Sequence, residues 1–212
     1  MITLALDTCL GACSVAVVDG DRTLADASEP MTRGHQERLA PMTREVMAAA
    51  GVAFSDLDRI GVTVGPGSFT GLRVGLAFAK GLALALDIPC LGVGALVALA
   101  AGVKTEGICV AVIDSGRGLV YRQTYQSGEA ARDPDVVTVE DAAAQAAEAL
   151  QRGAVTLVGP SEALLAAISG SAVQIVVAAP SAVVVAALAA RAPISPPRPL
   201  YLRPPDAKPK AA

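Results

Sequence analysis

The sequence predicts an α/β protein with two related lobes of mixed sheet and an extended tail. Short apolar, β-branched runs alternate with longer segments in which apolar residues recur at helical spacing, which is typical of sheets covered by helices. Residues 4–8 and 110–115 each combine an apolar run, an Asp and a hydroxyl residue before a turn and a returning strand. Seven prolines between Pro193 and Pro209 favour an extended chain. We therefore expect lobes over residues 1–103 and 104–192, and a tail over 193–212.

The first lobe is expected to begin with three meandering strands, because its apolar runs are separated by turn residues such as Asp19-Gly20. Apolar positions at helical spacing then predict a helix that Gly51 ends. A further strand leads through a glycine loop into a long apolar helix, for which Ser68 or Thr70 is the expected N-cap. The predicted elements are strands at 3–7, 14–18, 22–28, 60–64 and 91–93, and helices at 35–50, 70–87 and 95–101.

The second lobe is expected to repeat the strand, Asp, turn and strand order before a series of alternating helices and strands. The polar residues from Thr138 to Asp141 predict a helix start. All of the remaining elements up to residue 190 are assigned to this lobe. They are strands at 108–113, 119–125, 155–158 and 173–177, and helices at 138–150, 162–168 and 182–190.

Composition limits the classes of function. The chain has a net charge of −3 and only 3% aromatic residues, so it has no global attraction for nucleic acid and little material for a base-stacking surface. Its four cysteines form no CxxC pair and are expected to be free thiols. The N-terminus enters a strand at once, and the apolar window 172–190 is interrupted by Pro180, so we expect no leader, no membrane span and a cytoplasmic protein.

The glycine loop from Gly65 to Gly75 lies between a strand and a helix, where free backbone N–H groups could bind an anion. It lacks the Gly-Lys-Ser/Thr of a P-loop, and Thr70 stands where the third glycine of a dinucleotide fingerprint belongs. Spacing alone leaves two interpretations open. The loop is either an anion site that uses Gly65, Gly67 and Ser68, or a tight packing turn.

The helix after this loop is unusually apolar. Its charges between residues 73 and 87 are Arg73, Lys80 and Asp87, seven residues apart each time, so they form one narrow stripe. The rest of the helix surface is apolar, more than one sheet face requires. A partner surface is therefore expected on this helix.

Five ordered segments of the sequence form a recognisable set. They are Leu6-Asp7-Thr8, Gly34-His35-x-Glu37-Arg38-Leu39-x-Pro41, the glycine loop 65–75, Asp114-x-x-Arg117-Gly118-x-Val120-Tyr121 and Pro199-Leu200-Tyr201-Leu202-Arg203. Together they resemble the bacterial TsaB (YeaZ) family, and the duplicated plan resembles the actin, Hsp70 and sugar-kinase superfamily with its RNase H-like lobes. The resemblance extends from Asp7 to Arg203, nearly the whole chain.

The resemblance implies a role in making threonylcarbamoyladenosine beside the tRNA anticodon, as a non-catalytic partner of the paralogue TsaD. It implies a heterodimer with TsaD, docking of the ATPase TsaE, indirect contact with tRNA and a homodimer when the chain is alone. The interface is expected on helices 35–50 and 70–87. Its expected residues are Leu39, Met42, Val46, Leu72, Arg73, Leu76, Ala79, Lys80 and Ala83.

No catalytic residue or metal ligand is expected in this chain. TsaD-like enzymes hold a metal with two histidines four residues apart and an Asp, whereas this chain has a single histidine, His35, expected to anchor a helix start. Asp7, Thr8 and Asp114 could still orient Mg-ATP or Mg-ADP in the partner complex. The alternatives are a stand-alone ATPase or kinase that uses these three residues and, less favoured, a peptidase.

Overall fold

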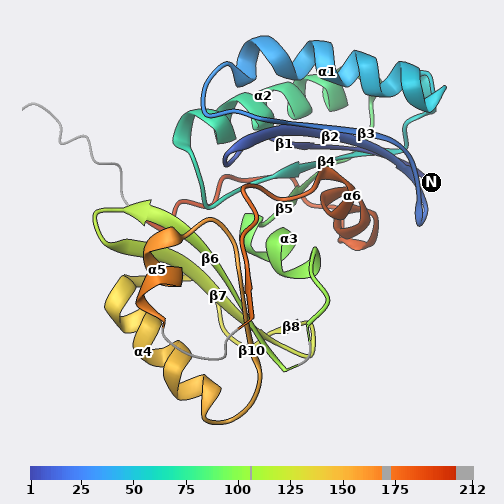
Figure 1. Cartoon of the computed structure of the whole chain (residues 1–212). Coiled ribbons are helices and arrows are strands. Elements are labelled where there is room, and N and C mark those ends of the chain that lie inside the picture. The colour runs from blue at the N-terminus through green and yellow to red at the C-terminus, as the bar shows by residue number, and fades with distance from the viewer. Residues whose placement is uncertain (106, 169–172, 204–212) are drawn as a thin grey trace, which may run out of the picture.

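The computed structural model describes residues 1–105, 107–168 and 173–203. It has two lobes, each built on its own sheet, with helices on the sheet faces (Figure 1). This arrangement confirms the expected α/β class and the duplicated strand order. Three short elements were not predicted from the sequence: the 3-10 turn Phe54–Asp56 and the strands β8 (Glu129–Ala130) and β9 (Asp135–Thr138).

The first sheet has the strand order β3-β2-β1-β4-β5. β1 pairs with β2 in antiparallel and with β4 in parallel, and β5 extends the parallel part. The central strand β1 is almost wholly buried, because helices cover both of its faces. The strands are β1 (Ile2–Asp7), β2 (Ala12–Asp19), β3 (Arg22–Pro30), β4 (Arg59–Thr63) and β5 (Cys90–Val93).

Helices α1 (His35–Ala50) and α2 (Phe69–Leu86) lie side by side on one face of this sheet (Figure 1). Their apolar stripes pack on Leu4, Leu6 and neighbouring residues of the sheet to form the largest core cluster. By length and composition alone, α2 is the one helix in the described ranges that could cross a membrane. The same composition suits a helix packed on a sheet, so this is weak evidence for a span.

The opposite face of the first sheet is covered by α6 (Ala182–Arg191), which corrects the expectation that this helix completes the second lobe. Small residues allow the close approach: a Cβ on Gly61 of β4 would lie 2.7 Å from the Cβ of Ala189. Ala5 in β1 and Val185 in α6 are fully buried in this layer. The chain therefore returns to the first lobe, because the second face of that sheet needs an apolar cover.

The second sheet has the order β11-β10-β6-β7-β8, and β9 pairs with the same edge of β7 as β8, at Leu119 to Arg122. α4 and α5 cover one face, whereas α3 (Ala95–Ala101) packs on the other and so lies between the lobes. Thr138 caps α4 by accepting a hydrogen bond from the Asp141 N–H at 3.0 Å. The elements are β6 (Ile108–Gly116), β7 (Leu119–Gln126), β10 (Val155–Val158), β11 (Val173–Ile175), α4 (Val139–Leu150) and α5 (Glu162–Ala167).

The described part of the tail lies against both lobes. Pro197 packs against Gly92 of β5, and the Leu200 N–H donates to the Val64 carbonyl oxygen at 2.7 Å. Arg203 then donates from Nη1 to the Ser115 carbonyl oxygen near the end of β6 at 2.8 Å. The tail thus joins the glycine loop of one lobe to the end of a strand of the other. Residues 204–212 of the expected tail lie outside the described residues.

Candidate functional site

The glycine loop leads from β4 into α2, and Ser68 is the N-cap of that helix. Its Oγ accepts a hydrogen bond from the Gly71 N–H at 3.3 Å. The Ser68 N–H is itself used inside the protein, because it donates to the Cys9 carbonyl oxygen at 2.7 Å. The cap is therefore docked on the turn that follows β1.

The glycines of this loop allow its backbone to rest directly on Thr8 and Cys9. A Cβ on Gly67 would lie 2.3 Å from the Cys9 carbonyl oxygen, and one on Gly71 would lie 2.0 Å from that of Thr8. Thr8 Oγ1 also donates to the Gly71 carbonyl oxygen at 2.7 Å. These contacts support the packing-turn interpretation, since a side chain at either glycine would collide with backbone.

Asp7, at the end of β1, is buried beneath this loop. Its Oδ1 accepts hydrogen bonds from Thr63 Oγ1 at 2.6 Å, from the Cys9 N–H at 3.2 Å and from Cys9 Sγ at 2.8 Å. Its Oδ2 is also buried and has no partner among the described residues. Burial raises the pKa of this carboxyl, and the hydrogen bonds from Cys9 and Thr63 oppose the rise. Asp7 is therefore held by its own lobe.

Asp114, its counterpart in the second lobe, is exposed, and its Oδ1 accepts the N–H of Gly116 at 2.6 Å in its own turn. The hydrogen bonds of Asp7 and Asp114 are thus local and do not connect the two residues. A nucleotide beside Thr8 would also have to displace the glycine loop. No group of three or more His, Cys, Asp or Glu that could hold a metal occurs within the described ranges.

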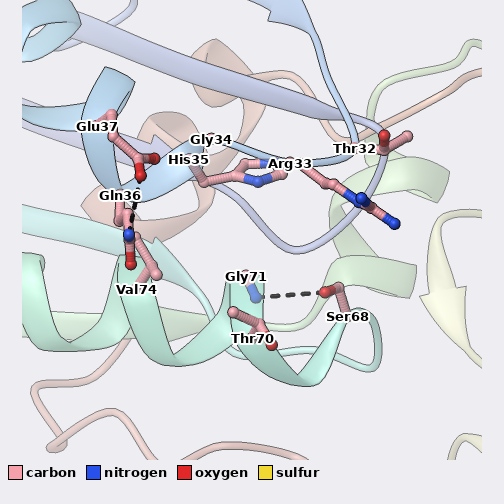
Figure 2. Close-up of a pocket in the computed structure, with 10 residues that line it drawn as sticks. All are labelled: Thr32, Arg33, Gly34, His35, Gln36, Glu37, Ser68, Thr70, Gly71 and Val74. Carbon is pink, nitrogen blue, oxygen red and sulfur yellow. Dashed lines mark hydrogen bonds between the residues drawn. The ribbon is translucent and has the colours of Figure 1, made fainter.

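A polar pocket of about 400 Å³ lies between the starts of α1 and α2. Figure 2 shows Arg33 and His35 on one side of it and Ser68 and Thr70 on the other. His35 is buried, and its Nε2 lies 3.3 Å from the Ala12 carbonyl oxygen. A carbonyl only accepts, so Nε2 carries the proton in this contact. His35 therefore anchors the helix start, as expected. The sequence did not predict the pocket, because its two walls are far apart along the chain.

The expected interface residues are, for the most part, not on the surface. Arg73 and Lys80 are exposed, but the other side chains lie in the chain's own core, which corrects the predicted interface. Helical spacing identified the stripe that faces the sheet, and a side chain that is buried in the monomer cannot also meet a partner. The buried members are Leu39, Met42, Val46, Leu72, Leu76, Ala79 and Ala83.

The opposite side of α2 carries an exposed stripe that is also largely apolar. Leu84 is 84% exposed, and Ala77, Gly81 and Ala85 are exposed beside it. We call these four residues the α2 stripe. Arg73 and Lys80 lie along the edge of this stripe, one above the other on the exposed side of the helix. An exposed apolar stripe of this kind is typical of a surface that meets a protein partner.

The sequence and the fold have close relatives. A family model described as TsaD, tRNA N6-adenosine threonylcarbamoyltransferase, matches residues 28–198. The chain is 38% identical to the tRNA threonylcarbamoyladenosine biosynthesis protein TsaB of Escherichia coli over 132 residues, 61% of this chain and 57% of that protein. The match thus spans little more than half of that relative. An uncharacterized Mycobacterium tuberculosis protein is 37% identical over 98% of this chain and 94% of its own length.

Solved structures extend the comparison. YeaZ from Pseudomonas aeruginosa superimposes with a TM-score of 0.82 at 32% identity, covering 95% of this chain and 99% of that one. An activator of 2-hydroxyisocaproyl-CoA dehydratase from Clostridium difficile, with bound ADPNP, gives a TM-score of 0.52 at 12% identity over 89% of this chain and 94% of that chain. The second likeness concerns the fold alone.

Proposed function

Because this chain belongs to the TsaB (YeaZ) family, we propose that it takes part in forming threonylcarbamoyladenosine in tRNA. The resemblance noted in the sequence is thereby confirmed at the level of the family. Support for the pathway comes from the names of the relatives, which are described as tRNA threonylcarbamoyladenosine biosynthesis proteins. Work on tRNA suits a cytoplasmic protein, so we propose that location as well.

Within this pathway, the proposed role is that of a non-catalytic subunit. It pairs with the TsaD-like paralogue, and the pair recruits the ATPase TsaE and meets the tRNA. The observation that carries this proposal is the α2 stripe, where a large aliphatic side chain, Leu84, stands 84% exposed among small residues. Small residues let a second helix approach closely, and Leu84 supplies an anchor for it.

α1 takes part as the neighbour of α2. Phe78 of α2 is only half-buried and belongs to the core cluster that the two helices share. The outward side of α1 is polar, since Glu37, Arg44 and Glu45 are exposed on it. We therefore place the centre of the interface on α2 and its polar rim on α1. When the paralogue is absent, a second copy of this chain occupies the same stripe.

A stand-alone ATPase or kinase is the second candidate, because the fold is shared with a nucleotide-binding activator. The local chemistry does not favour it. Oδ1 of Asp7 is taken up by Thr63 and Cys9, and the glycine loop covers the turn at Thr8. A peptidase is less favoured still, since His35 bonds to a backbone carbonyl instead of a nucleophile.

The test of the proposed function is reconstitution with the TsaD-like and TsaE-like proteins of the same organism. Co-purification measures pairing, and nucleoside analysis of tRNA measures threonylcarbamoyladenosine with and without this chain. Modification that requires the chain, without ATP hydrolysis by the chain alone, supports the subunit. Modification that proceeds equally well in its absence contradicts it.

A further inference from the structure

Two exposed aromatic side chains meet at the junction of the lobes, in a chain that has few aromatic residues. Phe69 at the start of α2 and Tyr201 in the tail are 46% and 47% exposed. Their ring centroids lie 5.6 Å apart with an interplanar angle of 39°. The guanidinium carbon of Arg73 lies 3.7 Å from the Phe69 centroid. We call these three residues the aromatic platform.

The platform is held in place by backbone contacts, although its parts are far apart in sequence. The Leu200 N–H donates to Val64 just before the glycine loop, which positions Tyr201. The Arg203 side chain donates to the Ser115 carbonyl oxygen at the end of β6, which fixes the other side of Tyr201. The two rings are therefore exposed on an ordered support.

The charge around the platform is the opposite of that of the whole chain. The three segments that meet there, 65–75, 114–118 and 198–203, carry four arginines and one carboxylate, Asp114, and so a net charge of +3. The full chain has a net charge of −3. The arginines are Arg73, Arg117, Arg198 and Arg203. Exposed aromatic rings among arginines are the combination that binds unpaired nucleotides, with bases on the rings and phosphates beside the cations.

We propose that the aromatic platform binds an unpaired base of the tRNA substrate and that the surrounding arginines contact the adjacent phosphates. This proposal rests on the proposed function, which supplies the RNA. The low aromatic content argues against an extended stacking surface, and the platform is a single contact. It adjoins the α2 stripe through Arg73, so tRNA held by the paired complex lies within reach of it.

The experiment measures the affinity of a full-length tRNA transcript for the reconstituted complex with the TsaD-like protein. Tyr201→Ala and Phe69→Ala are each expected to weaken binding roughly 5- to 100-fold, the range for loss of one base–aromatic stack. Tyr201→Trp retains a stacking face and should keep the affinity. Ile194→Ala is the control at saturating partner, because it removes another exposed apolar side chain of the tail, 70% exposed, which lies beside Leu84 and away from the platform. Arg198→Ala should lower the salt slope of binding by about 0.7.

Pairing with the TsaD-like protein is measured in parallel without RNA. Unchanged pairing with weakened tRNA binding supports the platform. If pairing is weakened but the tRNA affinity at saturating partner is unchanged, the platform is a protein contact and the proposal is overturned. Unchanged tRNA affinity in both alanine variants overturns it as well. The proposed function fails separately, if the unaltered chain neither pairs nor supports modification.

Discussion

Thr8 and Gly71 are in reciprocal contact: Thr8 Oγ1 donates to the Gly71 carbonyl oxygen at 2.7 Å, and a Cβ on residue 71 would lie 2.0 Å from the Thr8 carbonyl oxygen. The contact joins the end of β1 to the first turn of α2. Neither partner has room to move, because Ser68 fixes the loop on the Cys9 carbonyl oxygen as well. The glycine at position 71 is thus required by packing.

Gly71→Ala is therefore expected to lower the free energy of unfolding by about 1–3 kcal/mol, the usual cost of overpacking. The added methyl group must push the start of α2 away from Thr8. Urea unfolding followed by circular dichroism measures the loss.

Gly81→Ala in the same helix is the control. A Cβ on Gly81 would have nothing within 4 Å, so this change should raise stability by roughly 0.5–1 kcal/mol through helix propensity. If both variants behave alike, the loop does not depend on the close approach at Thr8.

Leu84→Glu should abolish pairing with the TsaD-like protein while the monomer stays folded. Leu84 is 84% exposed, so the charge costs the monomer little, but in a complex it would be buried without a partner. Size-exclusion chromatography of the mixed proteins measures pairing, and circular dichroism verifies the fold.

Leu76→Glu is expected to unfold the chain instead, because Leu76 is only 6% exposed and lies in the core beneath α2. A folded Leu76→Glu monomer would contradict the burial of Leu76 in the core. A Leu84→Glu variant that still pairs would show that the α2 stripe is not the interface.

These two leucines show what could be predicted from the sequence. The 3.6-residue periodicity correctly identified α2 and the stripe to which Leu76 belongs, because burial of apolar residues sets that pattern. The same periodicity does not show whether a second apolar stripe of the helix is covered by another part of the chain or is exposed. In α2 the strongest stripe faces the chain's own sheet. Apart from Leu84, the proposed partner face consists of small residues, which carry little periodic signal.

The long-range features of the fold were also beyond the sequence. α6 was assigned to the second lobe because it follows that lobe in the chain, whereas Gly61 makes room for it on the first sheet. The tail docks through backbone atoms of Leu200 and Val64, which no side-chain pattern records. Local signals predicted the order of the first-lobe strands along the chain, Ser68 or Thr70 as the N-cap of α2, and His35 as the anchor of a helix start. These predictions were confirmed, with Ser68 as the cap.

The buried carboxyl of Asp7 should make stability depend on pH. Burial raises the pKa of Asp7 in the folded chain above the ordinary value of 3.8, which it has in the unfolded chain. Between these two pKa values, the folded chain holds a proton that the unfolded chain has lost. The contribution of Asp7 is therefore most favourable below the ordinary value and declines as pH rises through the raised pKa. A difference of one between the folded-state and unfolded-state pKa values corresponds to about 1.4 kcal/mol in the free energy of unfolding.

Asp7→Asn removes this ionisation. The free energy of unfolding of this variant, minus that of the unaltered protein, should be larger at pH 8 than at pH 4. Urea unfolding at both pH values measures this difference. Thr63→Val provides a second variant, because it deletes a hydrogen bond that opposes the rise in pKa. The decline in stability should then continue to higher pH. An Asp7→Asn difference that is independent of pH would contradict this account.

The four cysteines should react slowly in the folded protein. Cys9, Cys13 and Cys109 are buried and Cys90 is half-buried. Burial raises the pKa of Cys13, Cys90 and Cys109 to about 11, and that of Cys9 is also raised. At pH 8 a thiol of pKa 11 is roughly one-thousandth thiolate, the reactive form. A disulfide exchange reagent should label Cys90 first, and Cys90→Ser should remove that phase. Rapid labelling of a second thiol would disprove the buried assignment.

The last prediction concerns the tail as a link between lobes. Arg203 Nη1 donates to the Ser115 carbonyl oxygen at 2.8 Å, a hydrogen bond from a charged donor that a neutral side chain cannot replace. Arg203→Ala should lower the free energy of unfolding by about 1–2 kcal/mol. It should also speed amide hydrogen exchange in residues 114–118 and 201–203, because the hydrogen bond that joins these two segments is lost. Arg198→Ala removes an exposed arginine from the same tail and should leave exchange at 114–118 unchanged. Equal exchange at 114–118 in both variants would mean that the β6–β7 turn is ordered without the tail.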